Sequence, residues 1–365
     1  MKLKLHFVIN SLHGGGAERV LSSLASFFDA QGHDVLIICL NYAKSAYEIP
    51  KGIKIHYLLK ERKKGLLYRG VYAYSTLKML VDIFKRDRPD CAISFMTSAN
   101  IWMGLAARIT KTPYIVSERI NPDHIEEFNY LQGRLLKEVY SKAKSVVAPS
   151  RGVEIAMLQT KALRGLENTK VIINPVKELG KVSNNVIHTK SYVLAVGRLD
   201  RQKGFDILIE AFSKLKKHDL DLLIVGEGNE RKALQDQINR LGLQNKIKLI
   251  GAKSQIQDYY HYAEIFVLPS RNEGYPNVLL EALSMGCPSI AMDCEFGPSE
   301  IIVHEENGLL VKEKTAEALA ANMERLLSDS LLKKKLSNNA RLINITNSSE
   351  EVFAKWQNLV YESIQ

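Results

Sequence analysis

The stretch VLPSRNEGYPNVLLEALSMGCPSI, residues 267–290, contains the pattern from which the fold is predicted. An apolar strand ends in a polar loop, and a largely apolar helix begins near Pro276, because proline suits the first turn of a helix. A second apolar run, CPSIAMD, follows at residues 287–293. This order is the βαβ unit of a parallel sheet with helices on its faces.

The same alternation runs through the chain and indicates two domains. Apolar runs rich in β-branched residues alternate with helical patterns, stop at the polar stretch 177–191 and then start again. A chain of 365 residues is also long for a single core. We therefore expect two Rossmann-like, doubly wound α/β domains, residues 1–183 and 184–349, with the last helix, 350–365, packed on either of them. Because ligands of such sheets lie beyond the carboxyl ends of the strands, the expected site is a cleft between the domains.

The composition limits the class of function. Residues 1–185 contain 28 lysines and arginines against 16 acids, whereas residues 186–365 contain 22 against 24. A basic half predicts contact with anions, but no aromatic-rich recognition module accompanies it, which argues against nucleic acid. No apolar run approaches the ~18 residues of a membrane-spanning helix. The four cysteines have no C-x-x-C spacing, so we expect reduced, buried thiols and a cytoplasmic location.

Three glycines, Gly14, Gly15 and Gly16, connect the first apolar run to an amphipathic helix. Glycines let the backbone approach an anion closely, and the start of a helix presents N–H donors. The spacing is neither G-x-G-x-x-G nor a P-loop, so a tight strand-to-helix turn is the alternative.

Two further turns in the second half have similar features. Arg198 and Lys203 flank a turn after an apolar run, where two cations can bracket a diphosphate. Solvated loop charges are the alternative. Gly226 closes the next such turn, but a glycine at a turn is a weak signal by itself.

Two glutamates lie on either side of the helix start in the opening stretch. Glu273 precedes the helix and Glu281 lies within it, and each carboxylate can accept hydrogen bonds from a pair of sugar hydroxyls. The amides of Asn277, Val278 and Leu279 include donors that lack intrahelical partners and can face phosphates. Glu281 on the helix surface is the alternative, although its apolar neighbours would make an unpaired carboxylate costly.

Five motifs occur in a familiar order. They are GGGAERV, VGRLDRQKG, VGEGNE, LPSRNEGYPNVLLEALSMGCPSI and ENGLLV, and together they resemble the retaining family 4 glycosyltransferases of the GT-B fold over essentially the whole chain. The chain is most similar to bacterial enzymes that extend lipid-linked oligosaccharides for O-antigen, capsule or protein N-glycosylation. The segments YEIPKGIKIHYL and GGAER are similar to N-acetylgalactosamine transferases of that group.

The resemblance implies a substrate class and a role for each candidate residue. The donor would be a UDP-sugar, the acceptor a polyprenyl-diphosphate-linked sugar, and neither a metal nor a cofactor would be needed. The first domain would bind the acceptor and the second the donor. Arg198 and Lys203 would bind the diphosphate of the donor, Glu273 would contact the transferred sugar, and Glu281 would contact the ribose. The phosphates would also be contacted by the amides of Asn277, Val278 and Leu279 and by the loop of Gly14, Gly15 and Gly16. Lys253 and Ser254 would contact the uracil, and Gly226 would contact the donor.

One position departs from the family. Many members carry a histidine in the loop after the fourth predicted strand, near the C6 hydroxyl of the donor sugar. Here the segment IVSERINPDH places Arg119 there, after Glu118. We expect Arg119 to bind a donor or acceptor phosphate. The alternatives are that His124 takes this position, or that Glu118 and Arg119 form a surface ion pair.

A basic cluster precedes a helical pattern in residues 60–88. The apolar residues of this pattern, among them Val71 and Tyr74, predict an ordinary packed helix face. The cluster itself can rest on an anionic leaflet or bind a polyprenyl diphosphate, which would place the protein at the inner face of the cytoplasmic membrane. The cluster consists of Lys60, Arg62, Lys63 and Lys64.

Two other enzyme classes are compatible with two doubly wound domains. A dinucleotide-dependent oxidoreductase is disfavoured by the missing G-x-G-x-x-G and by the cations Arg198 and Lys203. A sugar-nucleotide epimerase of the GT-B fold would turn over its substrate without an acceptor.

Overall fold

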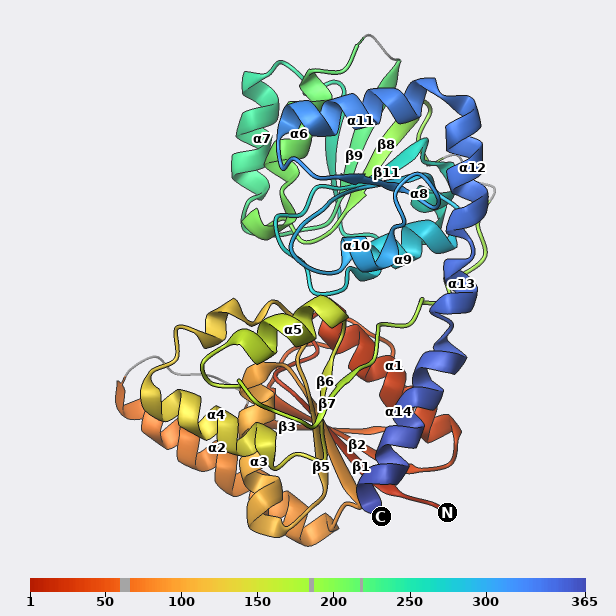
Figure 1. The fold of residues 1–365 in the computed structure, drawn as a ribbon. Coiled ribbons are helices and arrows are strands. Elements are labelled where there is room, and N and C mark those ends of the chain that lie inside the picture. The colour runs from red at the N-terminus through yellow and green to blue at the C-terminus, as the bar shows by residue number, and fades with distance from the viewer. Residues whose placement is uncertain (60–65, 184–186, 217–218) are drawn as a thin grey trace. The chain divides into compact units, whose positions relative to one another are not determined.

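The structure is a computed structural model of the chain. It describes all residues except 60–65, 184–186 and 217–218. Two parallel sheets are present, and each lies in its own compact unit (Figure 1). The two units are Met1–Pro175 with Glu350–Gln365, and Val176–Ser349.

The segment that connects the two sheets in sequence belongs to the second unit. The Val176 N–H donates to the carbonyl of Asn347 at 2.8 Å, and the Ser183 hydroxyl donates to Asp258 Oδ2 at 2.8 Å. The boundary therefore lies after residue 175, earlier than the predicted position after residue 183. The prediction followed polar composition, whereas hydrogen bonds determine to which unit this segment belongs.

The first unit contains a seven-stranded parallel sheet in the order β3-β2-β1-β4-β5-β6-β7. Strand β3 (Lys54–Leu59) was not predicted, because it lies at the edge and alternates exposed and half-buried residues instead of forming an apolar run. The other strands are β1 (Lys4–Ile9), β2 (Asp34–Asn41), β4 (Cys91–Phe95), β5 (Tyr114–Ser117), β6 (Ser145–Ala148) and β7 (Thr169–Val171).

Apolar clusters cover both faces of this sheet, because successive strand residues point to opposite sides. Phe7 belongs to one cluster and Val8 to the other. The cluster around Phe7 contains residues of α1 (Gly16–Ala30) and of the last helix, α14 (Ser349–Ile364), whose Trp356 is fully buried. The last helix thus packs on the first unit (Figure 1). The other cluster contains residues of α2 (Leu66–Asp87), α3 (Thr97–Thr110), α4 (Tyr130–Ser141) and α5 (Arg151–Gln159).

The second unit contains a six-stranded parallel sheet in the order β10-β9-β8-β11-β12-β13 (Figure 1). Its apolar core joins the strands to α6, α7, α11 and α12. The strands are β8 (Ser191–Val196), β9 (Leu220–Val225), β10 (Ile247–Gly251), β11 (Ile265–Leu268), β12 (Ser289–Met292) and β13 (Leu309–Val311). The helices are α6 (Phe205–Ser213), α7 (Arg231–Arg240), α8 (Ile256–Tyr262), α9 (Asn277–Ser284), α10 (Pro298–Ile301), α11 (Ala316–Ser328), α12 (Ser330–Ala340) and α13 (Ile343–Thr346).

Each sheet has a point at which the strand order reverses, between β1 and β4 and between β8 and β11. The loops on either side of such a point run in opposite directions and leave space at the carboxyl edge, where ligands of doubly wound sheets bind. The prediction of two doubly wound, Rossmann-like α/β units is confirmed. Each unit has one reversal point, and the candidate residues are described relative to these two places.

Candidate active site

Lys203 and Glu273 meet at the reversal point of the second unit. Lys203 ends the short 3₁₀ helix η2 (Arg201–Lys203) after β8, and Glu273 lies in the loop after β11. Lys203 Nζ lies 2.7 Å from Glu273 Oε1, and the Ser270 hydroxyl donates to the same oxygen at 2.7 Å. The Lys203 side chain is only 17% exposed and that of Glu273 only 7%. The two residues therefore form a largely buried ion pair, and Lys203 is not a solvated loop charge.

Two glycines allow the loops at this edge to come close together. Gly204 has φ +66°, and a Cβ there would lie 2.0 Å from the carbonyl oxygen of Pro269. The absence of a side chain lets η2 reach the loop after β11, which brings Lys203 to Glu273. Gly226 has φ +148°, and a Cβ there would lie 1.8 Å from the carbonyl oxygen of Gly197. Gly226 thus has a packing role, and its contact with a donor remains a prediction.

Arg198 lies on the same turn, but its side chain is 64% exposed. Its Nε donates to Asp200 Oδ2 at 2.9 Å, and Asp200 Oδ1 accepts the N–H of Lys203 at 3.2 Å. Asp200 therefore orders the turn that carries both cations. Across the part of the chain that the structure describes, Asp200 is the one acid paired with Arg198. An exposed guanidinium fork beside a held ammonium is suited to a diphosphate.

Helix α9 begins directly after Pro276, as predicted. Glu281 is buried rather than on the helix surface, and it accepts a hydrogen bond from the Tyr260 hydroxyl at 2.9 Å. We had expected the Leu279 N–H to be an open donor, but it donates to the Pro276 carbonyl at 3.1 Å. The Val278 N–H has no hydrogen-bond partner within the described ranges, which leaves it as a candidate phosphate donor.

Lys253 and Ser254 follow β10, and both are exposed. Strand β10 is the edge strand, and β9 separates it from β8. The predicted uracil contact therefore lies further along the same carboxyl edge as Lys203, and it remains a prediction.

The first unit has its reversal point between β1 and β4, where the Ser98 hydroxyl donates to Asn10 Oδ1 at 2.7 Å. The glycine loop follows β1, and Gly14 has φ +120°. The Gly15 N–H donates to the Tyr47 hydroxyl at 2.7 Å, and this hydroxyl donates to the Gly15 carbonyl at 2.6 Å. Burial raises the pKa of Tyr47. Because Tyr47 occupies the Gly15 amide, this amide can bind a phosphate only after Tyr47 moves.

Glu118 and Arg119 do not form the surface ion pair that the sequence allowed. They are adjacent residues after β5, and their side chains lie among different partners. Arg119 is 7% exposed, lies over the rings of Phe95 at 4.0 Å and Trp356 at 5.5 Å, and donates to Asn174 Oδ1 at 2.9 Å. Burial lowers its pKa to about 9. Arg119 is therefore buried rather than open at a loop surface, and its contact with a phosphate remains a prediction.

Glu118 lies in a buried polar network that sequence reasoning missed. The Thr97 hydroxyl donates to Glu118 Oε2 at 2.9 Å, and the Asn100 amide donates to Oε1 at 3.3 Å. The Tyr140 hydroxyl also donates to Oε1. Burial raises the pKa of Glu118, and these hydrogen bonds and His124 oppose the rise. The one signal in the sequence was the polar run TSAN after β4, whereas Tyr140 comes from α4.

His124 extends this network. Its Nδ1 lies 3.1 Å from the Asn121 carbonyl oxygen, which can only accept, so Nδ1 carries a proton. Its Nε2 lies 2.8 Å from Thr97 Oγ1. Thr97 Oγ1 thus lies within hydrogen-bonding distance of both His124 Nε2 and Glu118 Oε2 and links the imidazole to the carboxyl group.

The predicted membrane segment is described only in part. Val71 and Tyr74 are 60% and 70% exposed, so the packed face predicted for α2 does not include them, whereas Val81 and Phe84 are buried. Among the helices that the structure describes, none is both long enough and apolar enough to cross a membrane. The basic residues Lys60, Arg62, Lys63 and Lys64 lie outside the described residues.

Comparison with protein families identifies both halves of the chain. Residues 14–178 match the model described as Glycosyltransferase Family 4, and residues 176–343 match the model described as Glycosyl transferases group 1. The chain is a family 4 glycosyltransferase. The resemblance to family 4 glycosyltransferases of the GT-B fold is therefore confirmed, whereas retention of the sugar configuration remains a prediction.

Similar proteins include bacterial glycan-building enzymes. The GalNAc-alpha-(1->4)-GalNAc-alpha-(1->3)-diNAcBac-PP-undecaprenol alpha-1,4-N-acetyl-D-galactosaminyltransferase of Campylobacter jejuni is 29% identical over 93% of this chain and 93% of its own. The amylovoran biosynthesis glycosyltransferase AmsD of Erwinia amylovora is 26% identical over 98% and 99%. HepE of Anabaena, solved in complex with UDP, has the same fold with a TM-score of 0.79, 21% identity and coverage of 98% and 100%. The sucrose-phosphate synthase of Thermosynechococcus elongatus has a TM-score of 0.83, 18% identity and 98% coverage of both chains.

Proposed function

We propose that the enzyme transfers a hexose, with N-acetylgalactosamine as the first candidate, from a UDP-sugar to a polyprenyl-diphosphate-linked saccharide during surface polysaccharide or glycan assembly. The observation that carries the proposal is the buried Lys203–Glu273 pair at the β8–β11 reversal point. Glu273 also lies three residues before Pro276, where α9 starts. A cation, a carboxylate and a helix start at one sheet edge suit the diphosphate and the sugar of one donor. The undecaprenol-linked acceptor of the Campylobacter jejuni relative supports the acceptor class, and the role of the Erwinia amylovora relative in amylovoran biosynthesis supports the type of pathway.

The proposed chemistry requires stabilisation of a departing diphosphate. As the bond between the anomeric carbon and the phosphate oxygen breaks, negative charge accumulates on the phosphate. Lys203, Arg198 and the Val278 amide are donors held near the loop of Glu273 before the reaction starts, and such preorganised donors usually provide the largest catalytic effect. These fixed donors take the place that a metal would otherwise fill.

The proposed reaction retains the configuration of the sugar. The acceptor hydroxyl attacks from the face that the diphosphate leaves, and its proton passes to the departing phosphate oxygen. When the diphosphate pairs with Lys203, Glu273 becomes available to accept a hydrogen bond from the transferred sugar while Ser270 still donates to it.

We also propose that the first unit meets the membrane that carries the acceptor, at the inner face of the cytoplasmic membrane. Exposed aromatic and apolar side chains occur on α2 and at the start of α4: Val71, Tyr74, Tyr130 and Leu131 are 60–78% exposed. Such side chains next to basic residues favour an anionic lipid surface. Charge reversal of Lys63 and Lys64 should release the enzyme from phosphatidylglycerol vesicles, whereas reversal of the exposed Lys232 and Lys246 should not. Unchanged vesicle binding would remove this part of the proposal.

A thermal-shift screen followed by a transfer assay tests the main proposal. The ligands are UDP-GalNAc, UDP-Gal, UDP-Glc, UDP-GlcNAc and GDP-Man. A donor at 100 times its Kd adds about 2.7 kcal/mol to the free energy of unfolding, so one strong stabiliser names the sugar. NMR of the product formed with a lipid-linked acceptor then reports the anomeric configuration. The proposal fails if no UDP-sugar stabilises the enzyme, or if the sugar nucleotide is converted without an acceptor, as in an epimerase.

A further inference from the structure

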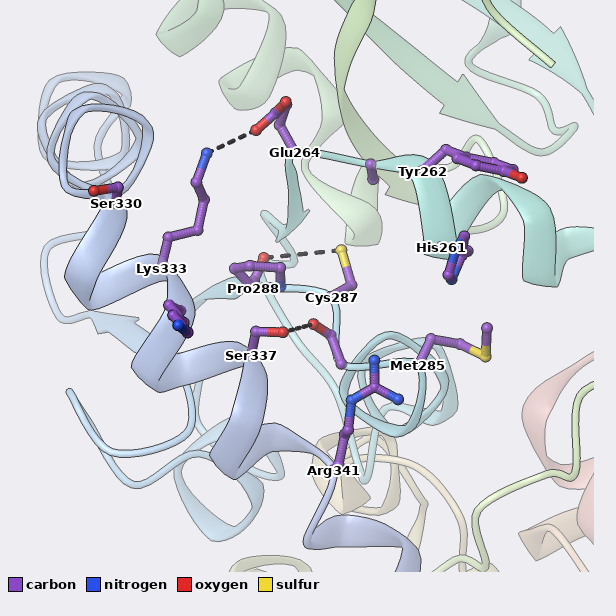
Figure 2. A pocket seen from close by; sticks show the side chains of 13 residues that line it. His261, Tyr262, Glu264, Met285, Cys287, Pro288, Ser330, Lys333, Ser337 and Arg341 are labelled. Atoms are coloured by element: carbon purple, nitrogen blue, oxygen red, sulfur yellow. Dashed lines mark hydrogen bonds and ion pairs between the residues drawn. The ribbon is translucent and has the colours of Figure 1, made fainter. Parts of the chain in front are cut away.

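A pocket of about 510 Å³ lies in the second unit, at the amino ends of β11 and β12 (Figure 2). This edge of the sheet is opposite to the carboxyl edge that carries Lys203 and Glu273. One wall is formed by residues 261–264, before β11, and by residues 285–288, before β12. The other wall is one face of α12 and the residue that follows it: Ser330, Lys333, Lys334, Ser337 and Arg341.

The pocket carries an excess of positive charge. Of its three lysines and arginines, Lys333 is neutralised, because its Nζ lies 2.7 Å from Glu264 Oε2 (Figure 2). Lys334 and Arg341 are exposed, and no carboxylate within the described ranges pairs with either of them. With Glu264 counted against the three cations, the lysines, arginine and acid that line the pocket carry a net charge of two positive units.

Arg341 lies close to the backbone of Gly286 and has no acidic partner among the residues that the structure describes. Gly286 has φ +72°, and a Cβ there would lie 2.6 Å from Arg341 Nε and 2.8 Å from its Cζ. The guanidinium thus packs against a glycine backbone in a space that any side chain would fill. The Ser337 hydroxyl donates to the Gly286 carbonyl at 2.7 Å and fastens this loop to α12 (Figure 2). The guanidinium donates no hydrogen bond to any residue that the structure describes, so its donors are open to a ligand.

We propose that this pocket binds a small phosphate-bearing anion of the size of a nucleoside monophosphate or a sugar phosphate. A guanidinium fork and an ammonium are the pair that proteins use to bind phosphate oxygens. The volume lies within the range of small-molecule sites, about 300–1,000 Å³. The ligand would touch Met285 and Gly286, which directly follow α9, the helix whose other end begins at Pro276. It would therefore bind at the far end of the helix that we assign to the donor.

NMR of the full chain labelled with ¹³C at the methionine methyl groups tests this inference at the pocket itself. Met285 lines the pocket, and its signal is assigned with Met285→Leu. Added pyrophosphate should shift the Met285 signal in a saturable way with a Kd of about 1 mM or lower, equivalent to about 4.1 kcal/mol or more of binding free energy. Lys334→Gln/Arg341→Gln should raise this Kd at least about tenfold, because both open cations are lost. Arg341→Lys, which keeps the charge but not the fork, should give an intermediate value.

Lys335→Gln is the matched control, because Lys335 lies on the same helix, pairs with Glu306 and does not line the pocket. A Met285 signal that does not respond to pyrophosphate, or that responds equally in the double variant, overturns the inference. Uridine monophosphate, glucose 1-phosphate and phosphatidylglycerol vesicles are then compared. A response to either soluble ligand supports the inference and names the source of the phosphate, whereas a response to vesicles alone overturns it in favour of a lipid surface. Sugar transfer is not measured, so failure here leaves the proposed function unaffected.

Discussion

Replacing Lys203 by methionine should separate the two roles of the Lys203–Glu273 pair. Methionine keeps most of the length of the side chain but removes the charge, and Glu273, which is 7% exposed, then retains the Ser270 hydroxyl at 2.7 Å but no cation. Breaking a buried pair by removing one partner costs about 3–5 kcal/mol. Because Lys203 is 17% exposed, we expect the lower end, about 3 kcal/mol. For a unit the size of Val176–Ser349 this lowers the unfolding midpoint by about 6–12 °C.

The double variant Lys203→Met/Glu273→Gln should recover stability but not activity. With both charges removed, no uncompensated carboxylate is buried, and the unfolding midpoint should return close to that of the unmodified enzyme. Transfer should stay lower by about 10²–10³, because the diphosphate still lacks its cation. Calorimetry and kcat/KM are measured on the unmodified enzyme, both single variants and the double variant. Lys232→Met, which alters an exposed lysine of the same unit, is the control.

Two results would refute this reasoning. If the double variant regains transfer together with stability, the pair is purely structural and the assignment of the donor site is wrong. If Lys203→Met keeps transfer within about threefold of the unmodified enzyme, Lys203 does not stabilise the departing diphosphate, since loss of such a donor has a far larger effect.

Three further changes test the packing and the buried titratable groups. Gly204→Ala should lower the free energy of unfolding by well above the ~1–2 kcal/mol of left-handed backbone strain, because the new Cβ would meet the Pro269 carbonyl. Gly242 has φ +69° and open space around it, so Gly242→Ala should lower the free energy of unfolding by that strain alone. Equal urea midpoints of the two variants would contradict this. Burial raises the pKa of Glu118, so the folded state holds a proton that the unfolded state loses above pH 4.5. The unmodified enzyme should therefore lose stability relative to Glu118→Gln as the pH rises from 4.5, and a constant difference in urea unfolding would contradict this. Burial lowers the pKa of His6 from 6.5 to about 4, so the unfolded state binds a proton at a higher pH than the folded state. The folded state is therefore destabilised as the pH falls from 6.5 to about 4, opposite to the effect of Glu118. The loss, on the order of 3 kcal/mol from about 1.4 kcal/mol per pKa unit, should be absent in His6→Phe; an equal acid loss in both proteins would show that His6 is not its source.

Features that depend on neighbouring residues could be predicted from the sequence. The alternation of apolar runs and helical patterns predicted two doubly wound sheets, because burial on both faces of a parallel strand requires a continuous apolar run. Pro276 marked the start of α9 for an equally local reason. Strand β3 was missed because an edge strand is partly exposed and lacks such a run.

The partner of each charged group was decided only by the tertiary structure. Lys203 and Glu273 are 70 residues apart in sequence, and they meet because β8 pairs with β11 and Gly204 permits a close approach. Glu118 and Arg119 show the reverse, since these sequence neighbours lie in different surroundings, one in a polar network with Thr97 and the other against aromatic rings. The amino-acid sequence alone therefore determined the family, the elements and the turns that carry the motifs. Strand pairing and burial determined which of its charges are paired, enclosed or open to a ligand, because these depend on contacts between residues far apart in the chain.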